Sequence, residues 1–439
     1  MKVAFVSLGC AKNLVNTEQM MALVRSAGHE ITAQPEGADA AVLNTCGFID
    51  SAKSEAIQNI LELAELKKEG KLGKLLVTGC LSQRYQDELM EELPEVDGVM
   101  GTGSYTEIVP ALEELMAGGT PHRFGDIDHT EEDGARIPAT PSYTAYLKIA
   151  EGCDNRCSYC AIPLIRGPFR SRPMENIVAE AQRLAACGVT ELNVVAQDTT
   201  RYGEDLYGRL ALPELLEKLC RLDGVRWVRM LYCYPDRITD RLLDVMAREE
   251  KIVKYMDIPI QHVNGRILSL MNRRGDAGSL TALMEKIRAR VPGVVLRTTL
   301  ITGFPTETQG EFEELCEFVQ RVRFERLGCF AYSAEEDTPA ALMDGQLDEE
   351  EKRRRAQIIM EQQYGVMEGF NRSQIGRRLT VAVEGREGRL WYGRSYMDAP
   401  DIDSRVYFSG HGPYSPGDYI EVEIDGVEGY DLKGKALNK

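Results

Sequence analysis

Histidine is scarce in this chain, and long apolar runs are absent. No two of the five histidines have the spacing of a zinc site and no H-E-x-x-H motif occurs, which argues against a zinc hydrolase; they are His29, His122, His129, His262 and His411. No apolar stretch reaches the roughly 20 residues that span a bilayer. The apolar run at 3–8 suits a buried strand better than a secretory signal. We therefore expect a cytoplasmic protein with no membrane partner.

Positive charge is also in deficit. The chain has 52 Lys and Arg against 69 Asp and Glu, which gives a formal net charge of −17. A surface that binds nucleic-acid phosphates broadly needs an excess of Lys and Arg. The balance therefore disfavours a nucleic acid as the direct substrate and suits a basic protein partner.

Cysteine, by contrast, is abundant, with 11 residues in the chain. An odd number in a long chain without a secretory signal does not indicate a disulfide framework. Metal ligation or redox chemistry is the expected use of these cysteines.

The periodicity of the sequence divides the chain into an α/β fold with three parts. Residues 1–117 alternate apolar strands with helical patterns and predict a parallel-sheet domain, and 118–138 has the composition of a linker. Residues 139–369 predict a partial (β/α)6 barrel that is open along one side. Its six expected strands are 146–150, 191–197, 225–233, 255–260, 294–301 and 326–332. Residues 372–439 alternate with a period of two and predict a small antiparallel β-barrel.

Three closely spaced cysteines, Cys153, Cys157 and Cys160, follow the first expected barrel strand; we call them the loop trio. They would lie at the carboxyl mouth of the barrel, where barrel active sites are found. Cysteine thiolates are the usual ligands of four-iron clusters, and three of them leave one iron free. A free iron could bind S-adenosylmethionine, which an electron from the cluster would split into a 5′-deoxyadenosyl radical. The alternative, a zinc knot, lacks a fourth ligand nearby in the sequence.

Three other cysteines are far apart in sequence but share one context; we call Cys10, Cys46 and Cys80 the strand-end trio. Each ends an apolar strand and precedes a helix, in VSLGC, VLNTC and LVTGC. The carboxyl ends of parallel strands meet at one edge of the sheet, so we expect a second cluster there. Buried core cysteines or a redox pair are the alternatives. The remaining cysteines are expected in the core; they are Cys187, Cys220, Cys233, Cys316 and Cys329.

The C-x-x-x-C-x-x-C pattern at 153–160 resembles the radical S-adenosylmethionine superfamily. Together with LGCAKN (8–13), NTCGF (44–48) and TGC (78–80), it resembles the methylthiotransferase family over almost the whole chain. This resemblance implies an N-terminal cluster domain, a radical barrel and a C-terminal TRAM barrel. It also implies two [4Fe–4S] clusters, S-adenosylmethionine and an electron donor such as a flavodoxin or ferredoxin.

One branch of that family modifies an adenosine in transfer RNA, and the other an aspartate of small-subunit ribosomal protein twelve. The stretches at 44–49, 196–203, 230–235 and 257–262 resemble the ribosomal-protein branch, and Gly47 stands where the other branch has serine. The resemblance therefore implies methylthiolation of the aspartate β-carbon. The same chemistry on transfer RNA remains an alternative. A non-catalytic two-cluster electron carrier is another.

The chain departs from the family pattern in two places. Ala11 replaces the proline of the usual LGCPKN motif, which affects loop stiffness more than ligation. The segment 332–338 lacks the proline and glycine of the usual YSPEEGT motif. These changes put the local loop conformation in doubt, but not the clusters.

Three residues at strand ends are candidates for contacts with the cofactor. Gln197 and Asp198 end the second expected barrel strand, where related enzymes contact the cofactor amino group; a helix N-cap is the alternative role for Asp198. Gln261 ends the fourth strand and could bind cofactor or substrate.

Three further candidates depend on backbone or charge arguments. Gly303 would let the backbone approach a nucleotide closely, or form an ordinary turn. Arg297 faces inward by strand alternation and needs a partner, either the cofactor carboxylate or a salt bridge with a helix. Tyr159 precedes the last cysteine of the loop trio and could stack near the adenine or simply pack.

Overall fold

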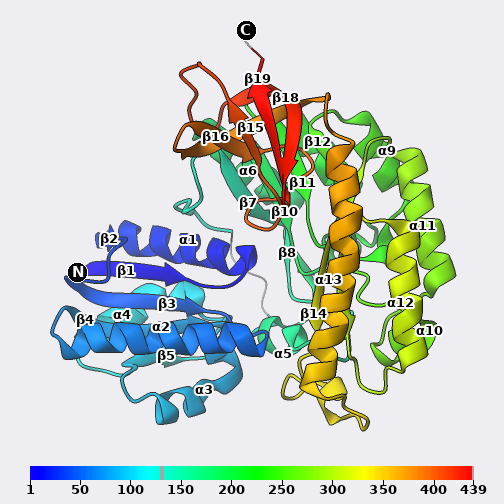
Figure 1. Ribbon diagram of the computed structural model, residues 1–439. Helices are drawn as coiled ribbons and strands as arrows, with labels where there is room; N and C mark the ends of the chain where they lie inside the picture. The colour runs from blue at the N-terminus through cyan, green and yellow to red at the C-terminus, as the bar shows by residue number, and fades with distance from the viewer. Residues whose placement is uncertain (129–132, 438–439) are drawn as a thin grey trace.

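The N-terminal part of the chain forms a parallel sheet of six strands in the order β2-β1-β3-β4-β5-β6 (Figure 1). The computed structural model describes residues 1–128 and 133–437, so parts of the expected linker (129–132) and C-terminal barrel (438–439) lie outside the described residues. The strands are β1 (Lys2–Ser7), β2 (Glu30–Thr32), β3 (Ala38–Thr45), β4 (Leu72–Gly79), β5 (Gly98–Met100) and β6 (His122–Arg123). β6 lies in the segment expected to be a linker, so the sheet extends beyond residue 117.

Helices cover both faces of this sheet, which explains why its central strands are apolar throughout. α1 and α4 pack on one face and α2 and α3 on the other. The helices are α1 (Ala11–Ser26), α2 (Asp50–Lys68), α3 (Cys80–Glu92) and α4 (Ile108–Met116), with a 3-10 turn η1 (Tyr105–Glu107). The expected strands and the first three helices are present. The sequence analysis missed α4 and the strands of two or three residues, which are too short to show a period.

The central part is a six-stranded sheet with its strands side by side in chain order, β7-β10-β11-β12-β13-β14. All of its pairs are parallel, as expected for a partial barrel. The strands are β7 (Thr144–Lys148), β10 (Glu191–Val195), β11 (Trp227–Met230), β12 (Ile252–Asp257), β13 (Val295–Thr302) and β14 (Arg326–Ala331). A two-stranded ribbon, β8 (Ala150–Glu151) with β9 (Arg170–Ser171), follows the first strand.

Helices on the outer face of this sheet bury the largest apolar core of the protein. They are α6 (Met174–Ala186), α7 (Glu204–Tyr207), α8 (Leu212–Cys220), α9 (Asp240–Arg248), α10 (Gly265–Leu270), α11 (Ala277–Arg290), α12 (Gln309–Val322) and α13 (Glu349–Arg372). The short helix α5 (Ile162–Arg166), between β8 and β9 in the chain, contributes no residue to this core. Three 3-10 turns, η2 (Thr199–Arg201), η3 (Pro235–Arg237) and η4 (Pro339–Leu342), lie in the connections. No helix in the described part of the chain combines the length and apolarity needed to cross a bilayer.

The C-terminal strands close into a five-stranded barrel in the order β15-β16-β17-β19-β18. They are β15 (Arg378–Glu387), β16 (Leu390–Arg394), β17 (Val406–Ser409), β18 (Tyr419–Glu428) and β19 (Asp431–Ala436). The barrel is antiparallel as expected except for one pair, because β17 and β19 run parallel.

Buried ion pairs join this barrel to the central sheet, against which it packs in Figure 1. Glu191 is fully buried and accepts from Arg394 at 2.6 Å and from Arg229 at 3.2 Å. Arg326 pairs with Asp398 at 2.7 Å. Breaking a pair of this kind leaves an uncompensated charge in the interior, so these contacts hold the barrel in place.

Candidate functional site

The strand-end trio leaves neighbouring strands at one edge of the N-terminal sheet. Cys10 follows β1, Cys46 follows β3 and Cys80 follows β4, and these three strands are adjacent. Gly9 has a φ of +84°, and a Cβ on it would lie 2.6 Å from Cβ of Cys46. A glycine at this position therefore lets the first two cysteine segments come together.

The charges around the strand-end trio favour the thiolate form at Cys10 more than at Cys46. Burial raises the pKa of the Cys46 thiol to about 11, and the neighbouring Cys80 and Cys10 raise it further. Burial acts in the same direction on Cys10, but Lys12 and Arg166 outweigh it and lower the pKa of that thiol.

The loop trio lies between β8 and α5, beside the carboxyl ends of the first strands of the central sheet. The Cys160 N–H donates to the carbonyl oxygen of Cys157 at 3.0 Å, which makes the loop a tight turn. Burial raises the pKa of the Cys153 thiol to about 11, with further contributions from Asp198 and Cys157. Arg273 is buried and donates to Sγ of Cys157 at 3.7 Å.

A single short helix separates the two trios. α5 begins two residues after Cys160, and its residue Ile165 packs with Ala161 against Cys80 of the other trio. Thr102, which follows β5, donates to the carbonyl oxygen of Ile165 at 2.6 Å. The segment that follows the loop trio therefore packs directly against the N-terminal domain beside Cys80.

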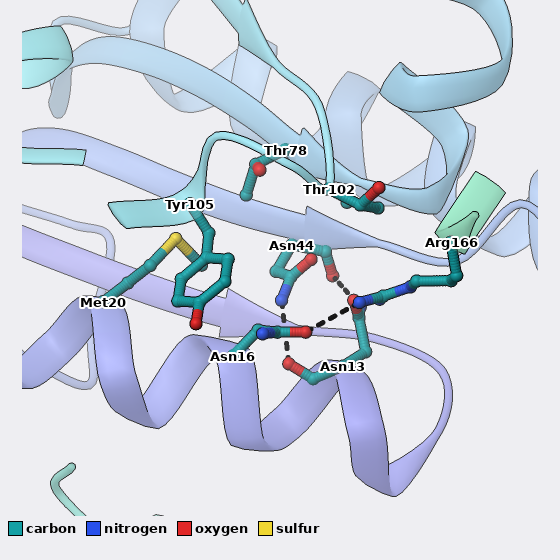
Figure 2. Close-up of a pocket in the computed structure, with 9 residues that line it drawn as sticks. Asn13, Asn16, Met20, Asn44, Thr78, Thr102, Tyr105 and Arg166 are labelled. Atoms are coloured by element: carbon teal, nitrogen blue, oxygen red, sulfur yellow. Dashed lines mark hydrogen bonds between the residues drawn. The ribbon is translucent and has the colours of Figure 1, made fainter. Parts of the chain in front are cut away.

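Arg166, the last residue of α5, reaches from the central domain into the N-terminal domain (Figure 2). Its guanidinium donates to Oδ1 of Asn16 at 2.8 Å, Oδ1 of Asn13 at 2.9 Å and Oε2 of Glu151 at 3.2 Å. It also lies 3.5 Å from Sγ of Cys80. Sequence reasoning missed Arg166, since nothing in the local pattern around 162–168 indicates a partner in another domain.

The cavity beside Arg166 in Figure 2 is about 10 Å³ in volume, which leaves room for about one water molecule. Polar residues line it together with Met20 and Gly79; they are Asn13, Asn16, Asn44, Thr78, Thr102, Tyr105 and Arg166. It is too small for a nucleoside, so it belongs to the support of the strand-end trio and not to a cofactor pocket.

The chemistry of both trios fits thiolate-bound clusters better than a single metal ion. Among residues 1–128 and 133–437, no three His, Cys, Asp or Glu side chains converge closely enough to share one ion. The irons of a cluster each take their own thiolate, so cluster ligands lie farther apart than the ligands of one ion. The Asn13 N–H donates to the carbonyl oxygen of Cys10 at 2.9 Å, and Arg166 donates to Sγ of Cys80 at 3.5 Å. Such hydrogen bonds to sulfur tune the potentials of protein-bound clusters.

Two predicted cofactor residues lie beside the loop trio. Asp198 is fully buried, accepts the Arg201 N–H at 3.2 Å as the cap of η2, and pairs with Arg237 at 3.1 Å. The capping role considered for it is therefore present. Nε2 of Gln197 donates to Oε1 of Glu151 at 2.5 Å, whereas its own Oε1 is buried without a hydrogen-bond partner among the described residues.

Tyr159 and Gln261 lie near the same mouth. Tyr159 packs in a small apolar cluster with Met271 and Phe304. Gln261 has a left-handed φ of +69°, and its backbone pairs with β13, where the N–H of Ile301 donates to its carbonyl oxygen at 2.7 Å. The side chain of Gln261 is thus held at the end of β12 and β13.

Arg297 and Gly303 lie against protein groups that the sequence did not indicate. Arg297 pairs with Asp257 of the neighbouring strand at 2.8 Å and with Asp403 of the C-terminal barrel at 3.5 Å, not with a helix. Gly303 has a φ of +71°, and a Cβ there would lie 3.0 Å from Cα of Lys352 in α13. The close backbone approach at this glycine is therefore to α13.

Of the cysteines expected in the core, Cys220 and Cys233 are buried and Cys316 and Cys329 are partly buried. Cys187 is exposed, because it follows the end of α6 where the chain turns. The expectation of core packing was wrong for Cys187.

Three family profiles match the chain. They are the uncharacterized protein family UPF0004 over residues 2–101, the radical SAM superfamily over residues 147–319 and the TRAM domain over residues 375–437. The chain is 48% identical to "Ribosomal protein uS12 methylthiotransferase RimO" of Lachnoclostridium phytofermentans, covering 99% of this chain and 100% of the relative. It is 49% identical to the RimO protein of Pelotomaculum thermopropionicum, covering 99% of both.

The chain belongs to the uS12 methylthiotransferase family. It is therefore a radical S-adenosylmethionine enzyme, and that class of enzyme uses S-adenosylmethionine and one [4Fe–4S] cluster. The alternative of a non-catalytic electron carrier is thereby disfavoured, and the expected family is confirmed.

Solved structures share the fold of this family member at low identity. The methyltransferase TsrM of Kitasatospora setae superposes with a TM-score of 0.57 and 13% identity, covering 78% of this chain and 75% of that chain. The radical enzyme OxsB superposes with a TM-score of 0.52 and 12% identity, covering 82% of this chain and 56% of that chain. These matches show that the fold is shared over most of this chain.

Proposed function

We propose that the protein methylthiolates the β-carbon of an aspartate in ribosomal protein uS12, with the loop trio and the strand-end trio each holding a [4Fe–4S] cluster. The observation that carries this proposal is the contact of α5, which begins two residues after Cys160, with Cys80 of the strand-end trio through Ile165. A sulfur-inserting enzyme must bring a radical and a sulfur donor to one carbon atom, and two neighbouring sites satisfy that need.

The side chains of this enzyme would bind and support the clusters. When bound, the clusters and S-adenosylmethionine would supply the radical that removes a hydrogen atom and the methylthio group that replaces it. Arg166 places a buried positive charge beside Cys80, which offsets the negative charge of thiolates. Ala161 and Ile165 are buried against Cys80 and exclude water between the two sites.

The six predicted cofactor residues divide into two groups. Gln197 would accept a hydrogen bond from the amino group of S-adenosylmethionine, because its buried Oε1 has no other donor among the described residues. Tyr159 and Gln261 would contact the same ligand from the mouth of the sheet. Asp198, Arg297 and Gly303 already contact protein groups and would position the others. Asp198 pairs with Arg237 and Arg297 with Asp257, and the Gly303 N–H donates to Oε2 of Glu307 at 2.9 Å.

Ribosomal protein uS12 is the proposed partner because it is the substrate in the names of the relatives. The net charge of −17 agrees with a basic protein partner. A flavodoxin or ferredoxin is the proposed electron donor. No observation in the structure favours transfer RNA.

Anaerobic reconstitution of three proteins tests the proposal. We expect about eight iron atoms in the wild type and about four in each variant in which one trio is replaced by alanine. The strand-end variant should still release 5′-deoxyadenosine, but should not add a methylthio group to uS12 in a mass spectrum. A wild-type protein that binds about four irons, or that modifies transfer RNA and not uS12, would contradict the proposal.

A further inference from the structure

Residues 270–273, at the end of α10 and just beyond it, bond to the backbone of the loop that carries the loop trio. The Ser158 N–H donates to the carbonyl oxygen of Met271 at 3.1 Å, and Nδ2 of Asn272 donates to the carbonyl oxygen of Arg156 at 2.9 Å. Asn272 and Arg156 both have a left-handed φ, of +54° and +48° respectively. Residues other than glycine keep such a conformation where their surroundings impose it, and they are concentrated at functional sites. The segment 270–273 therefore fixes the position of this loop.

The last residue of this segment, Arg273, places its guanidinium against a cysteine of the loop trio. Arg273 is buried, and it donates to Sγ of Cys157 at 3.7 Å and to the carbonyl oxygen of Pro259 at 2.6 Å. Its guanidinium carbon lies 4.3 Å from the centroid of the Tyr234 ring. A buried guanidinium is costly unless anions and hydrogen-bond acceptors compensate it. The thiolate form of Cys157 is the anion among these three partners, so the charges of Arg273 and of this thiolate stabilise each other.

A fixed positive charge at this position affects how readily a bound cluster accepts an electron. Reduction adds one negative charge to the cluster, and its attraction to a buried cation is stronger than in water because the surroundings have a low dielectric constant. Hydrogen bonds to the sulfurs and net charge are among the features that set the reduction potential of a protein-bound cluster. Arg274, the next residue in the chain, is exposed, so water and salt screen its charge. The two neighbouring arginines therefore differ in burial and not in charge.

We propose that Arg273 raises the reduction potential of the [4Fe–4S] cluster held by the loop trio, and so favours the reduced state that cleaves S-adenosylmethionine. This inference rests on the proposed function, which assigns a cluster to the loop trio. Arg273 is a positioning residue that acts through Cys157. It transfers neither an electron nor a proton, since the electron comes from the external donor. The charge of the side chain, and not its shape, carries the effect.

A redox titration of the strand-end variant, in which alanines replace Cys10, Cys46 and Cys80, measures this potential for the loop trio alone. The full-length protein is reconstituted anaerobically, and the reduced cluster is followed by electron paramagnetic resonance. Arg273→Met in this background should keep about four irons, but its reduction should be at least roughly tenfold less favourable, which is a fall of about 59 mV for one electron. Arg273→Lys should recover at least half of that fall, because it keeps a positive charge.

Arg274→Met is the matched control and should leave the potential unchanged, because the charge that it removes is exposed. The dissociation constant of S-adenosylhomocysteine is measured on the same proteins and should not change; its carboxylate is another anion that a guanidinium binds. The inference is overturned if Arg273→Met keeps the potential of its parent, if it loses iron, if Arg273→Lys recovers nothing, or if S-adenosylhomocysteine binding weakens in place of the potential. If the strand-end variant itself binds no cluster, the proposed function fails instead.

Discussion

Replacing Arg166 with glutamine tests whether one side chain joins the two halves of the site. The guanidinium is 4% exposed and pairs with Glu151, whose carboxylate is 5% exposed. The substitution removes that pair, and it also removes the donors to Asn13 and Asn16 in the N-terminal domain. Glutamine is too short to reach all of these acceptors from the end of α5.

The expected loss follows from the contacts that remain. Breaking a buried ion pair costs about 3–5 kcal/mol when one charge is left alone. Lys148 remains paired with Glu151 at 3.0 Å in the variant. The loss in the free energy of unfolding should therefore lie at the lower end of this range, about 3 kcal/mol. If the central domain unfolds as one cooperative unit of about 150–250 residues, that corresponds to a fall in Tm of roughly 6–12 °C.

Scanning calorimetry of the metal-free protein measures this effect without any contribution from the clusters. Arg170→Gln is the matched control, because the Arg170 guanidinium donates to the backbone carbonyls of Pro168 and Arg166 at 2.8 and 3.3 Å. It should lower Tm by no more than roughly 2–4 °C. If Arg166→Gln behaves like the control, the guanidinium does not hold the domains together and the argument for its role is refuted.

Three further predictions concern the surroundings of the site. Burial would raise the pKa of Glu191, but its two arginine partners lower it to about 2 from an ordinary 4.5. The Tm of the wild type should therefore exceed that of Glu191→Gln by a constant amount from pH 8 to about 5, and the difference should shrink as the pH falls from 4.5 toward 2. Calorimetry of the metal-free proteins measures this difference. Gly303→Ala should lower Tm, because its Cβ would lie 3.0 Å from Cα of Lys352 in a left-handed conformation; an unchanged Tm with weaker S-adenosylhomocysteine binding would instead support a contact with the nucleotide. Gly47→Val, which introduces a larger side chain than the serine of the other branch, should lower the iron content of the strand-end trio alone, because a Cβ there would lie 2.7 Å from Cα of Leu81; iron lost equally from both sites would contradict this reasoning.

Much of the fold was predictable because its determinants are local. Apolar runs bounded by turn residues marked the six central strands, all of which are present within a few residues of their expected positions. The strand-end trio could be inferred because a cysteine at the end of each parallel strand must lie at the same edge of the sheet. The short strands β2, β5 and β6 were not predictable, since two or three residues carry no period.

The ion-pair partners of charged residues could not be predicted from the sequence. Alternation placed Arg297 on the inner face of its strand, but Asp257 and Asp403 became its partners only when β12 and the C-terminal barrel came to lie beside it. Gly303 was predicted to allow a close approach to a nucleotide, and the group beside it in the structure is α13.

The sequence by itself determined the two cysteine trios, the three-part organisation and the family, because spacing and periodicity are properties of the chain. Tertiary structure alone decided that Arg166 reaches Asn13 across 153 positions, and that Lys12 lies against Tyr232 of another domain. Contacts between distant segments depend on how whole domains pack. A buried charge forms its ion pair only when the packing of the domains brings the partner beside it and removes both groups from water.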